Sequence, residues 1–470
     1  MPPSLDDQNK IKDVENDVSS VPNENAIADA SNPQNWSQRR KVTIIGLVTF
    51  STLNDALACT IFAPVVSQLL EDFHSPSPTV ASLLISIHGI GFVVGLLFLA
   101  PLSEIYGRCP LMHVSNGVFL TSALLSALSV NVPMMVVARI LMGLAGCVPA
   151  TMGGGVIADL MPVDKRGMAM AIWASGILLG NVIGPIIGGY MAMNVGWRWT
   201  FWMEVIVSGC SAIACIFLMR ETYTPLLMRQ QSRGSPPQAP RQKQVIWHAI
   251  ARPTKLLTRS PVVILTSIYN SAAYVYTYFL ITTFPRLFTE EYGFNPGQVG
   301  LTYIGQGLGF CIAMLTVGVF SDRYTRHRQK LKGAFTPEDR LPPILLGCCC
   351  LAIGMICYGW TVKAQTHWIA PIVATGFAGL GIAYLFSSVD LYLVDSYPLY
   401  ASSAIAANVV VRSILGALLP LAAPELYNRL GYGWGNSLLG FIALTLAPTT
   451  LLLYKYGEWL RCHSRFQVNL

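Results

Sequence analysis

The sequence predicts an all-α membrane protein in which twelve transmembrane helices form two pseudo-symmetric bundles of six. Three observations lead to this fold class: an apolar composition, long apolar runs, and a loop sequence that recurs once in each half. Of the 470 residues, 53% are hydrophobic and only 12% are charged, and the mean hydropathy is +0.50. Soluble domains carry about 25% charged residues, so this composition excludes an ordinary soluble protein.

The apolar residues gather in runs of roughly 20, the length that a helix needs to cross a hydrocarbon core of about 30 Å. Helices are expected because a helix satisfies its own backbone polar groups in lipid. The twelve runs are Val42–Val66, Val80–Leu102, Leu111–Leu128, Met134–Asp159, Met168–Met191, Thr200–Met219, Pro261–Phe284, Gln298–Phe320, Leu341–Thr361, Trp368–Val394, Ser403–Pro424 and Asn436–Tyr456.

The longest interior hydrophilic stretch, Arg220–Ser260, divides these runs six and six. We therefore expect two six-helix bundles, at 39–219 and 261–456, joined by a basic cytoplasmic linker at 220–260. Residues 457–470 form a second tail, and residues 1–38 are polar and acidic, which predicts a disordered tail.

The loops after the second and eighth runs repeat one pattern. Both place a serine, an acid and a tyrosine at the same spacing, in Ser103–Arg108 and in Ser321–Tyr324. The matching location favours a duplication of the six-helix unit. Charges here could pair with others on the same face, locking that face closed until the halves move, or they could belong to ordinary solvated loops. The charged residues of the two loops are Glu104, Arg108, Asp322 and Arg323.

The distribution of basic residues predicts the orientation. With a cytoplasmic N-terminus, the cytoplasmic side holds 23 Lys and Arg and the opposite side only 4. This is a strong positive-inside bias, and it places both termini in the cytoplasm. The formal net charge of +7 therefore reflects topology, and nucleic-acid binding is not expected.

Nothing in the sequence indicates a cofactor, a metal or a disulfide framework. The 11 cysteines lie almost entirely inside the runs and form no C-x-x-C pair, so we expect free thiols. The sequon Asn35-Trp36-Ser37 is on the predicted cytoplasmic side and should be unglycosylated. No P-loop, His-rich metal cluster or nucleophile motif lies inside a run, so no enzyme activity is expected.

The fifth run carries small residues at four-residue spacing. Gly176, Gly180, Gly184 and Gly188 share one face of a helix, which allows another helix to approach closely. Pro185 removes a backbone hydrogen bond and permits a bend, and Gly189 closes the pattern. The alternative is a plain packing groove, as in any membrane bundle.

Together these patterns resemble the major facilitator superfamily, and within it the fungal branch of twelve-span drug:proton antiporters, from Asn32 to Tyr456. The chain departs from the family pattern at Ala100, Cys109, Met142 and Thr325. Besides the glycine pattern and the first loop, the motifs that carry the resemblance are Asn32–Ser37, Arg139-x-x-x-Gly143-x-x-Gly146, Asp159 with Lys165-Arg166-Gly167, Trp197–Trp199, Pro337–Pro343, Tyr392–Tyr397 and Ser403-Ala404-x-x-Ala407-Asn408-x-x-x-Arg412.

The resemblance implies two bundles that rock about a central cavity. We expect a monomer in the plasma membrane, with a vacuolar or vesicular membrane as the alternative. The resemblance also implies proton-coupled efflux of a hydrophobic or amphipathic small organic molecule, such as a fungal secondary metabolite, toxin or drug. The alternatives are a carrier for a nutrient or a polar metabolite such as a polyamine, a transporter-like membrane sensor, and a membrane enzyme.

Ionisable residues inside the runs are costly in lipid and therefore suggest function or a buried partner. Asp55 in the first run is the first candidate for a protonatable acid, and Asp390 in the tenth is the second. The resemblance assigns Arg139 to proton coupling, with an ion-pair strut as the alternative. Glu204, nearer the outer end of the sixth run, is open to hydration, and His88 is expected to be a hydrogen-bonded packing residue.

Aromatic and polar residues supply candidates for a substrate cavity. In the seventh run, Tyr269 and Tyr276 share one face and Tyr274 and Tyr278 another, and at least one pair should face the cavity, where aromatic walls suit bulky or planar substrates. Core packing is the alternative for each. The full set of cavity candidates is Asn54, Tyr269, Asn270, Tyr274, Gln306, Asn408 and Arg412.

Overall fold

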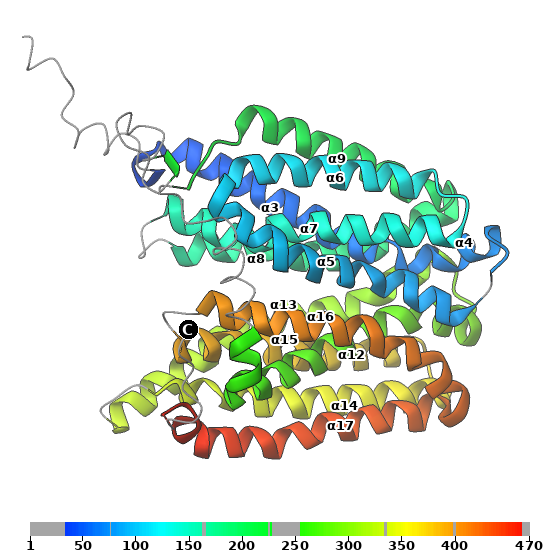
Figure 1. The fold of residues 1–470 in the computed structure, drawn as a ribbon. Coiled ribbons are helices and arrows are strands. Elements are labelled where there is room, and N and C mark those ends of the chain that lie inside the picture. The colour runs from blue at the N-terminus through cyan, green and yellow to red at the C-terminus, as the bar shows by residue number, and fades with distance from the viewer. Residues whose placement is uncertain are drawn as a thin grey trace, which may run out of the picture.

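The computed structural model consists of two helical bundles that lie side by side (Figure 1). It describes residues 33–75, 77–161, 166–223, 226–227, 254–332, 336–397 and 401–462. Within these ranges every regular element is helical. The predicted tail 1–38 and linker 220–260 lie largely outside the described residues, as do the side chains of Glu104 and Asp322.

The N-terminal bundle contains the first six spans and occupies the upper half of Figure 1. The first span bends where α3 passes through a short 3-10 turn, Ala63–Val65, into α4. The helices are α3 (Gln38–Thr60), α4 (Val66–Asp72), α5 (Pro78–Tyr106), α6 (Arg108–Ala127), α7 (Val132–Leu160), α8 (Arg166–Asn194) and α9 (Arg198–Leu218).

The C-terminal bundle contains the other six spans. Its last helix is broken at Gly431, whose φ of 68° and ψ of 173° are not helical, so the twelfth span begins after this glycine. The helices are α12 (Pro261–Tyr292), α13 (Pro296–Lys332), α14 (Pro342–Lys363), α15 (Ile369–Ser396), α16 (Ala401–Leu418) and α17 (Ala423–Cys462). The predicted fold class, twelve helices in two six-helix bundles, is confirmed.

Two of the twelve spans are less apolar than the others. In the described part of the chain, nine stretches are long and apolar enough to cross a membrane, and one of these, Ala404–Arg461, contains both α16 and most of α17. The remaining spans, α6 and α12, carry more polar side chains. In α12 these include Thr266, Asn270 and Ser271, which are buried inside the protein. A span can hold polar residues when they face the bundle interior and not lipid.

The glycine face of α8 packs on α3. A Cβ atom at Gly180 would lie 2.7 Å from the Leu53 carbonyl oxygen, and one at Gly188 would lie 2.1 Å from that of Ile61. At Gly184 the nearest atom is Oγ1 of Thr60, a hydroxyl that also donates to the Gly180 carbonyl at 3.3 Å. These glycines let α3 and α8 approach backbone to backbone.

The two bundles meet mainly through α8 against α13 and α5 against α16. We call the end of the bundles where α3 begins and α17 ends the basic end, and the opposite end the far end. Near the far end, a Cβ at Gly189 of α8 would lie 2.2 Å from the Pro296 carbonyl oxygen of α13. Closer to the middle, Ser86 of α5 donates to the Ala417 carbonyl of α16 at 2.9 Å. These contacts close the bundles against each other from the middle to the far end.

Candidate functional site

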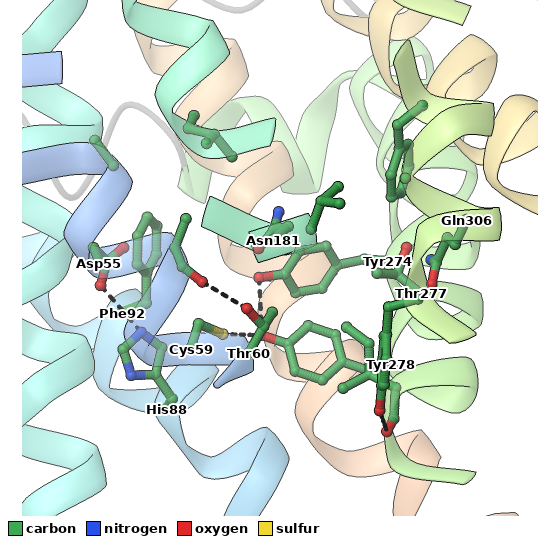
Figure 2. A pocket seen from close by; sticks show the side chains of 18 of the residues that line it. Asp55, Cys59, Thr60, His88, Phe92, Asn181, Tyr274, Thr277, Tyr278 and Gln306 are labelled. Carbon is green, nitrogen blue, oxygen red and sulfur yellow. Dashed lines mark hydrogen bonds and ion pairs between the residues drawn. The ribbon is translucent and has the colours of Figure 1, made fainter. Parts of the chain in front are cut away.

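A cavity of about 180 Å³ lies between the two bundles. Figure 2 shows Asp55, Cys59, Thr60 and His88 on the N-terminal side and Tyr274, Thr277, Tyr278 and Gln306 on the other. Four of the predicted site residues line it: Asp55, Tyr274, Gln306 and Arg412. The other lining residues are Thr52, Ala56, Phe92, Ala150, Ile177, Asn181, Val182, Ile281, Tyr303, Gly307 and Phe310.

The acid of the cavity, Asp55, is buried beside a histidine. Its Oδ1 lies 3.2 Å from Nε2 of His88, but the two atoms are not aligned for a hydrogen bond, and neither has a hydrogen-bond partner among the described residues. The expectation that His88 is a hydrogen-bonded packing residue is therefore wrong. Asp55 and His88 thus form a close acid–imidazole pair at the cavity wall.

The glycines of the α7 motif make room for this pair. A Cβ at Gly146 would lie 1.7 Å from Oδ1 of Asp55, and one at Gly143 would lie 2.1 Å from the His88 carbonyl oxygen. A side chain larger than hydrogen at either position would displace α3 or α5. The motif in span four therefore positions the acid, although neither glycine is a cavity-lining residue.

Arg139, one turn before Gly143 on α7, is buried outside the cavity. Its guanidinium donates to four carbonyl oxygens, those of Ala58 and Cys59 on α3 at 2.7 and 3.2 Å, and those of Leu84 and Ile85 on α5 at 3.3 and 3.4 Å. It thereby fixes the two helices that carry Asp55 and His88. The alternative of an ion-pair strut does not describe it, because its hydrogen-bond acceptors are neutral.

Glu204 on α9 is fully buried, so the expectation that it is hydrated is wrong. Neither of its carboxylate oxygens has a hydrogen-bond partner among the described residues. The carboxyl group lies within electrostatic reach of Arg139 and Asp55. Glu204 is therefore a second candidate for proton binding in the N-terminal bundle. Its position near the end of the predicted span did not indicate that it is buried.

The seventh span divides its tyrosines between two faces. Tyr274 and Tyr278 line the cavity with ring centroids 4.9 Å apart, and the Tyr278 hydroxyl lies 3.3 Å from Sγ of Cys59 across the bundle interface. Tyr276 donates to the Leu439 carbonyl of α17. Tyr269, a predicted cavity residue, donates to the Leu446 carbonyl of α17 at 3.0 Å and therefore belongs to the packing face of α12.

Three predicted amides also lie outside the cavity lining. Asn270 Nδ2 donates to Oδ1 of Asp390 at 3.0 Å, so the predicted second acid is held behind the wall. Asn408 is fully buried, and both of its amide atoms lack a hydrogen-bond partner among the described residues. Asn54 on α3 is buried and is not among the residues that line the cavity.

The charged residues at the basic end pair within each bundle. Arg108 Nε lies 2.6 Å from Oδ2 of Asp159, and Arg340 Nε lies 3.0 Å from Oδ2 of Asp395. The expectation that Arg108 pairs with another acid at this end is confirmed, and neither of these two pairs joins the two bundles. Arg323 is exposed, and the side chains of its neighbours in the predicted lock, Glu104 and Asp322, lie outside the described part of the chain.

Several cavity residues were not predicted, and α3 carried a signal for them. Thr52, Ala56, Cys59 and Thr60 line the cavity together with Asp55, and helical spacing of three to four residues places them on one face. That periodicity could have identified them once Asp55 was chosen. Asn181 also lines the cavity, but it lies on α8. No spacing within α3 could have predicted it.

Comparisons with known proteins agree with this architecture. The sequence profile described as Major Facilitator Superfamily matches residues 48–420 and 273–458. The chain is 40% identical over 452 residues to "MFS-type transporter tndD" of Aspergillus flavipes, covering 92% of this chain and 84% of the relative.

A second relative, "Efflux pump radE" of Floropilus chiversii, is 41% identical over 461 residues, covering 94% of this chain and 85% of that protein. In structure, the chain resembles the xylose transporter XylE from E. coli in a partially occluded inward-open conformation, with a TM-score of 0.65, 16% identity, and coverage of 89% and 98%. The chain belongs to the major facilitator superfamily and groups with its fungal MFS-type transporters and efflux pumps.

Proposed function

We propose that the protein is a proton-coupled antiporter that exports a hydrophobic or amphipathic small organic molecule, with a fungal secondary metabolite, toxin or drug as the cargo. The observation that carries the proposal is a protonatable acid, Asp55, in the wall of an otherwise mostly apolar cavity between two bundles. The relative named as an efflux pump supports the direction of transport.

The proposed orientation follows from the basic residues. The basic end faces the cytoplasm, as the positive-inside rule requires, and the protein acts in the plasma membrane as a monomer. Because the contacts between the bundles run from the middle to the far end, the cavity is then sealed from outside and would receive cargo from the cytoplasm. Rocking of the bundles about the cavity would open it outward.

In the proposed cycle, Asp55 takes up a proton when the cavity faces outward and releases it when the cavity faces inward. His88 lies 3.2 Å from Asp55 and shares the cavity wall with it. Arg139 couples this chemistry to movement, since it holds both α3 and α5. Asp390 is the second candidate for the proton site.

Cargo accumulation in an efflux-deficient yeast strain tests this proposal. Expression of the protein should lower the accumulation of members of a panel of hydrophobic dyes, and a protonophore should abolish the effect. Asp55→Asn should remove the pH-driven component, because an amide cannot exchange a proton. Glu425→Gln is the matched control, since Glu425 is exposed at the far end and, in the described part of the chain, pairs with Arg429 alone. Full pH-driven efflux by Asp55→Asn would contradict the assignment.

A further inference from the structure

Two arginines lie inside the membrane spans, and their surroundings differ. Arg139 is saturated by carbonyl oxygens. Arg412 on α16 lines the cavity, and among the described residues it makes neither an ion pair nor a hydrogen bond; its Nε is buried without a partner. A guanidinium carries five N–H donors, and leaving them without acceptors in the membrane is costly.

The contacts that Arg412 does make are with aromatic rings. Its Cζ lies 5.5 Å from the ring centroid of Tyr274 and 5.1 Å from that of Phe386. Cation–π contacts of this kind orient a guanidinium and stabilise its charge, but they leave its N–H groups free. The rings therefore hold Arg412 in place while its donors remain available to a ligand.

No acid among the described residues forms an ion pair with Arg412 within 4 Å. Asp390 interacts with it electrostatically, and its Oδ1 accepts from Asn270. Asp55 is on the opposite bundle and has His88 at 3.2 Å. The cavity thus contains a positive group on its C-terminal wall whose acceptor is missing from the described protein.

We propose that Arg412 is the anion-binding residue of the cavity and that the cargo is an amphipathic organic acid, with a carboxylate or an ionised enol on an apolar body. The planar guanidinium fork matches two acidic oxygens. The apolar side chains of Phe92, Ile177, Val182 and Phe310 would receive the body of the molecule. This inference rests on the proposed export function and narrows its cargo class.

A pair of probes that differ only in charge tests the inference. We choose 1-naphthaleneacetate and the neutral 1-naphthaleneacetamide, and measure their binding to the purified full-length protein by calorimetry. Wild type should bind the acid about tenfold or more tightly than the amide, as expected for a hydrogen bond to a charged group. Arg412→Gln should abolish this preference while binding of the amide changes by less than about twofold.

Two further variants keep the test interpretable. Arg412→Lys retains the charge without the fork and should keep part of the preference for the acid. Arg429→Gln removes an exposed arginine that pairs with Glu425 at the far end and should leave the preference unchanged. The ratio of the two affinities is measured on the wild-type protein. It therefore tests the proposal even if Arg412→Gln fails to fold.

Equal or tighter binding of the amide by wild type, or no binding of the acid, would overturn the proposal. Proton-driven export of the amide without any preference for the acid would also overturn it, yet would leave the exporter function intact. Failure of every dye in the yeast panel to be exported would instead count against the proposed function itself.

Discussion

The two bundles place an arginine and an acid in opposite arrangements around one cavity. In the N-terminal bundle the arginine, Arg139, is buried behind the wall and saturated by carbonyls, whereas the acid, Asp55, lines the cavity. In the C-terminal bundle the acid, Asp390, is held behind the wall by Asn270, whereas the arginine, Arg412, lines the cavity. Under the proposed function, this difference corresponds to a division of labour in which one bundle binds the proton and the other the cargo.

At the basic end, by contrast, the bundles are alike. Arg108 at the start of the third span pairs with Asp159 at the end of the fourth, and Arg340, just before the ninth, pairs with Asp395 at the end of the tenth. These positions correspond under a duplication of six helices. The bundles thus match in their ion pairs at the basic end, and they differ in the charged residue that each presents to the cavity.

The largest effect is expected at Gly146, on the N-terminal side of the comparison. Gly146→Ala would place a Cβ 1.7 Å from Oδ1 of Asp55, so the carboxylate or its helix must move. Overpacking of this kind costs about 1–3 kcal/mol. We expect loss of proton-driven export, together with a lower melting temperature of the purified protein.

Gly46→Ala is the matched control for this substitution. Gly46 lies on α3, the same helix as Asp55, and a Cβ there meets no atom within 4 Å. Export and melting temperature should both remain at wild-type values. If Gly146→Ala exported normally, the claim that the α7 motif positions Asp55 would be wrong.

A smaller and different effect is expected at Gly416, on the C-terminal side. A Cβ there would lie 2.3 Å from Cδ1 of Tyr274, the ring that flanks Arg412. Because a side chain can rotate away, we expect Gly416→Ala to weaken binding of naphthaleneacetate by about threefold to tenfold, or roughly 1 kcal/mol. Protonation of Asp55 should be unaffected. If Gly416→Ala lost proton-driven export but bound naphthaleneacetate as tightly as wild type, the proposed division of labour would be wrong.

The sequence was sufficient to predict the fold because each span is defined by local composition and length. It also identified Asp55 and Arg412, since a charge inside an apolar run is conspicuous. It could not tell which ionisable residues line the cavity and which are buried behind it, because the hydrogen bonds from Arg139 to carbonyls and the burial of Glu204 depend on helices far apart in the chain. Helical periodicity predicted which tyrosines of α12 share a face. It did not predict which face meets the cavity, because that depends on the packing of α17 against Tyr269.

The central claim is that the N-terminal bundle binds the proton and the C-terminal bundle binds the cargo. Comparing Asp55→Asn with Arg412→Gln in two assays tests it most directly: calorimetric binding of naphthaleneacetate and naphthaleneacetamide, and pH-driven export of the dye panel. Asp55→Asn should lose pH-driven export and keep the wild-type preference for the acid over the amide, whereas Arg412→Gln should lose the preference. Loss of the preference in Asp55→Asn, or full pH-driven export by Asp55→Asn, would contradict the account.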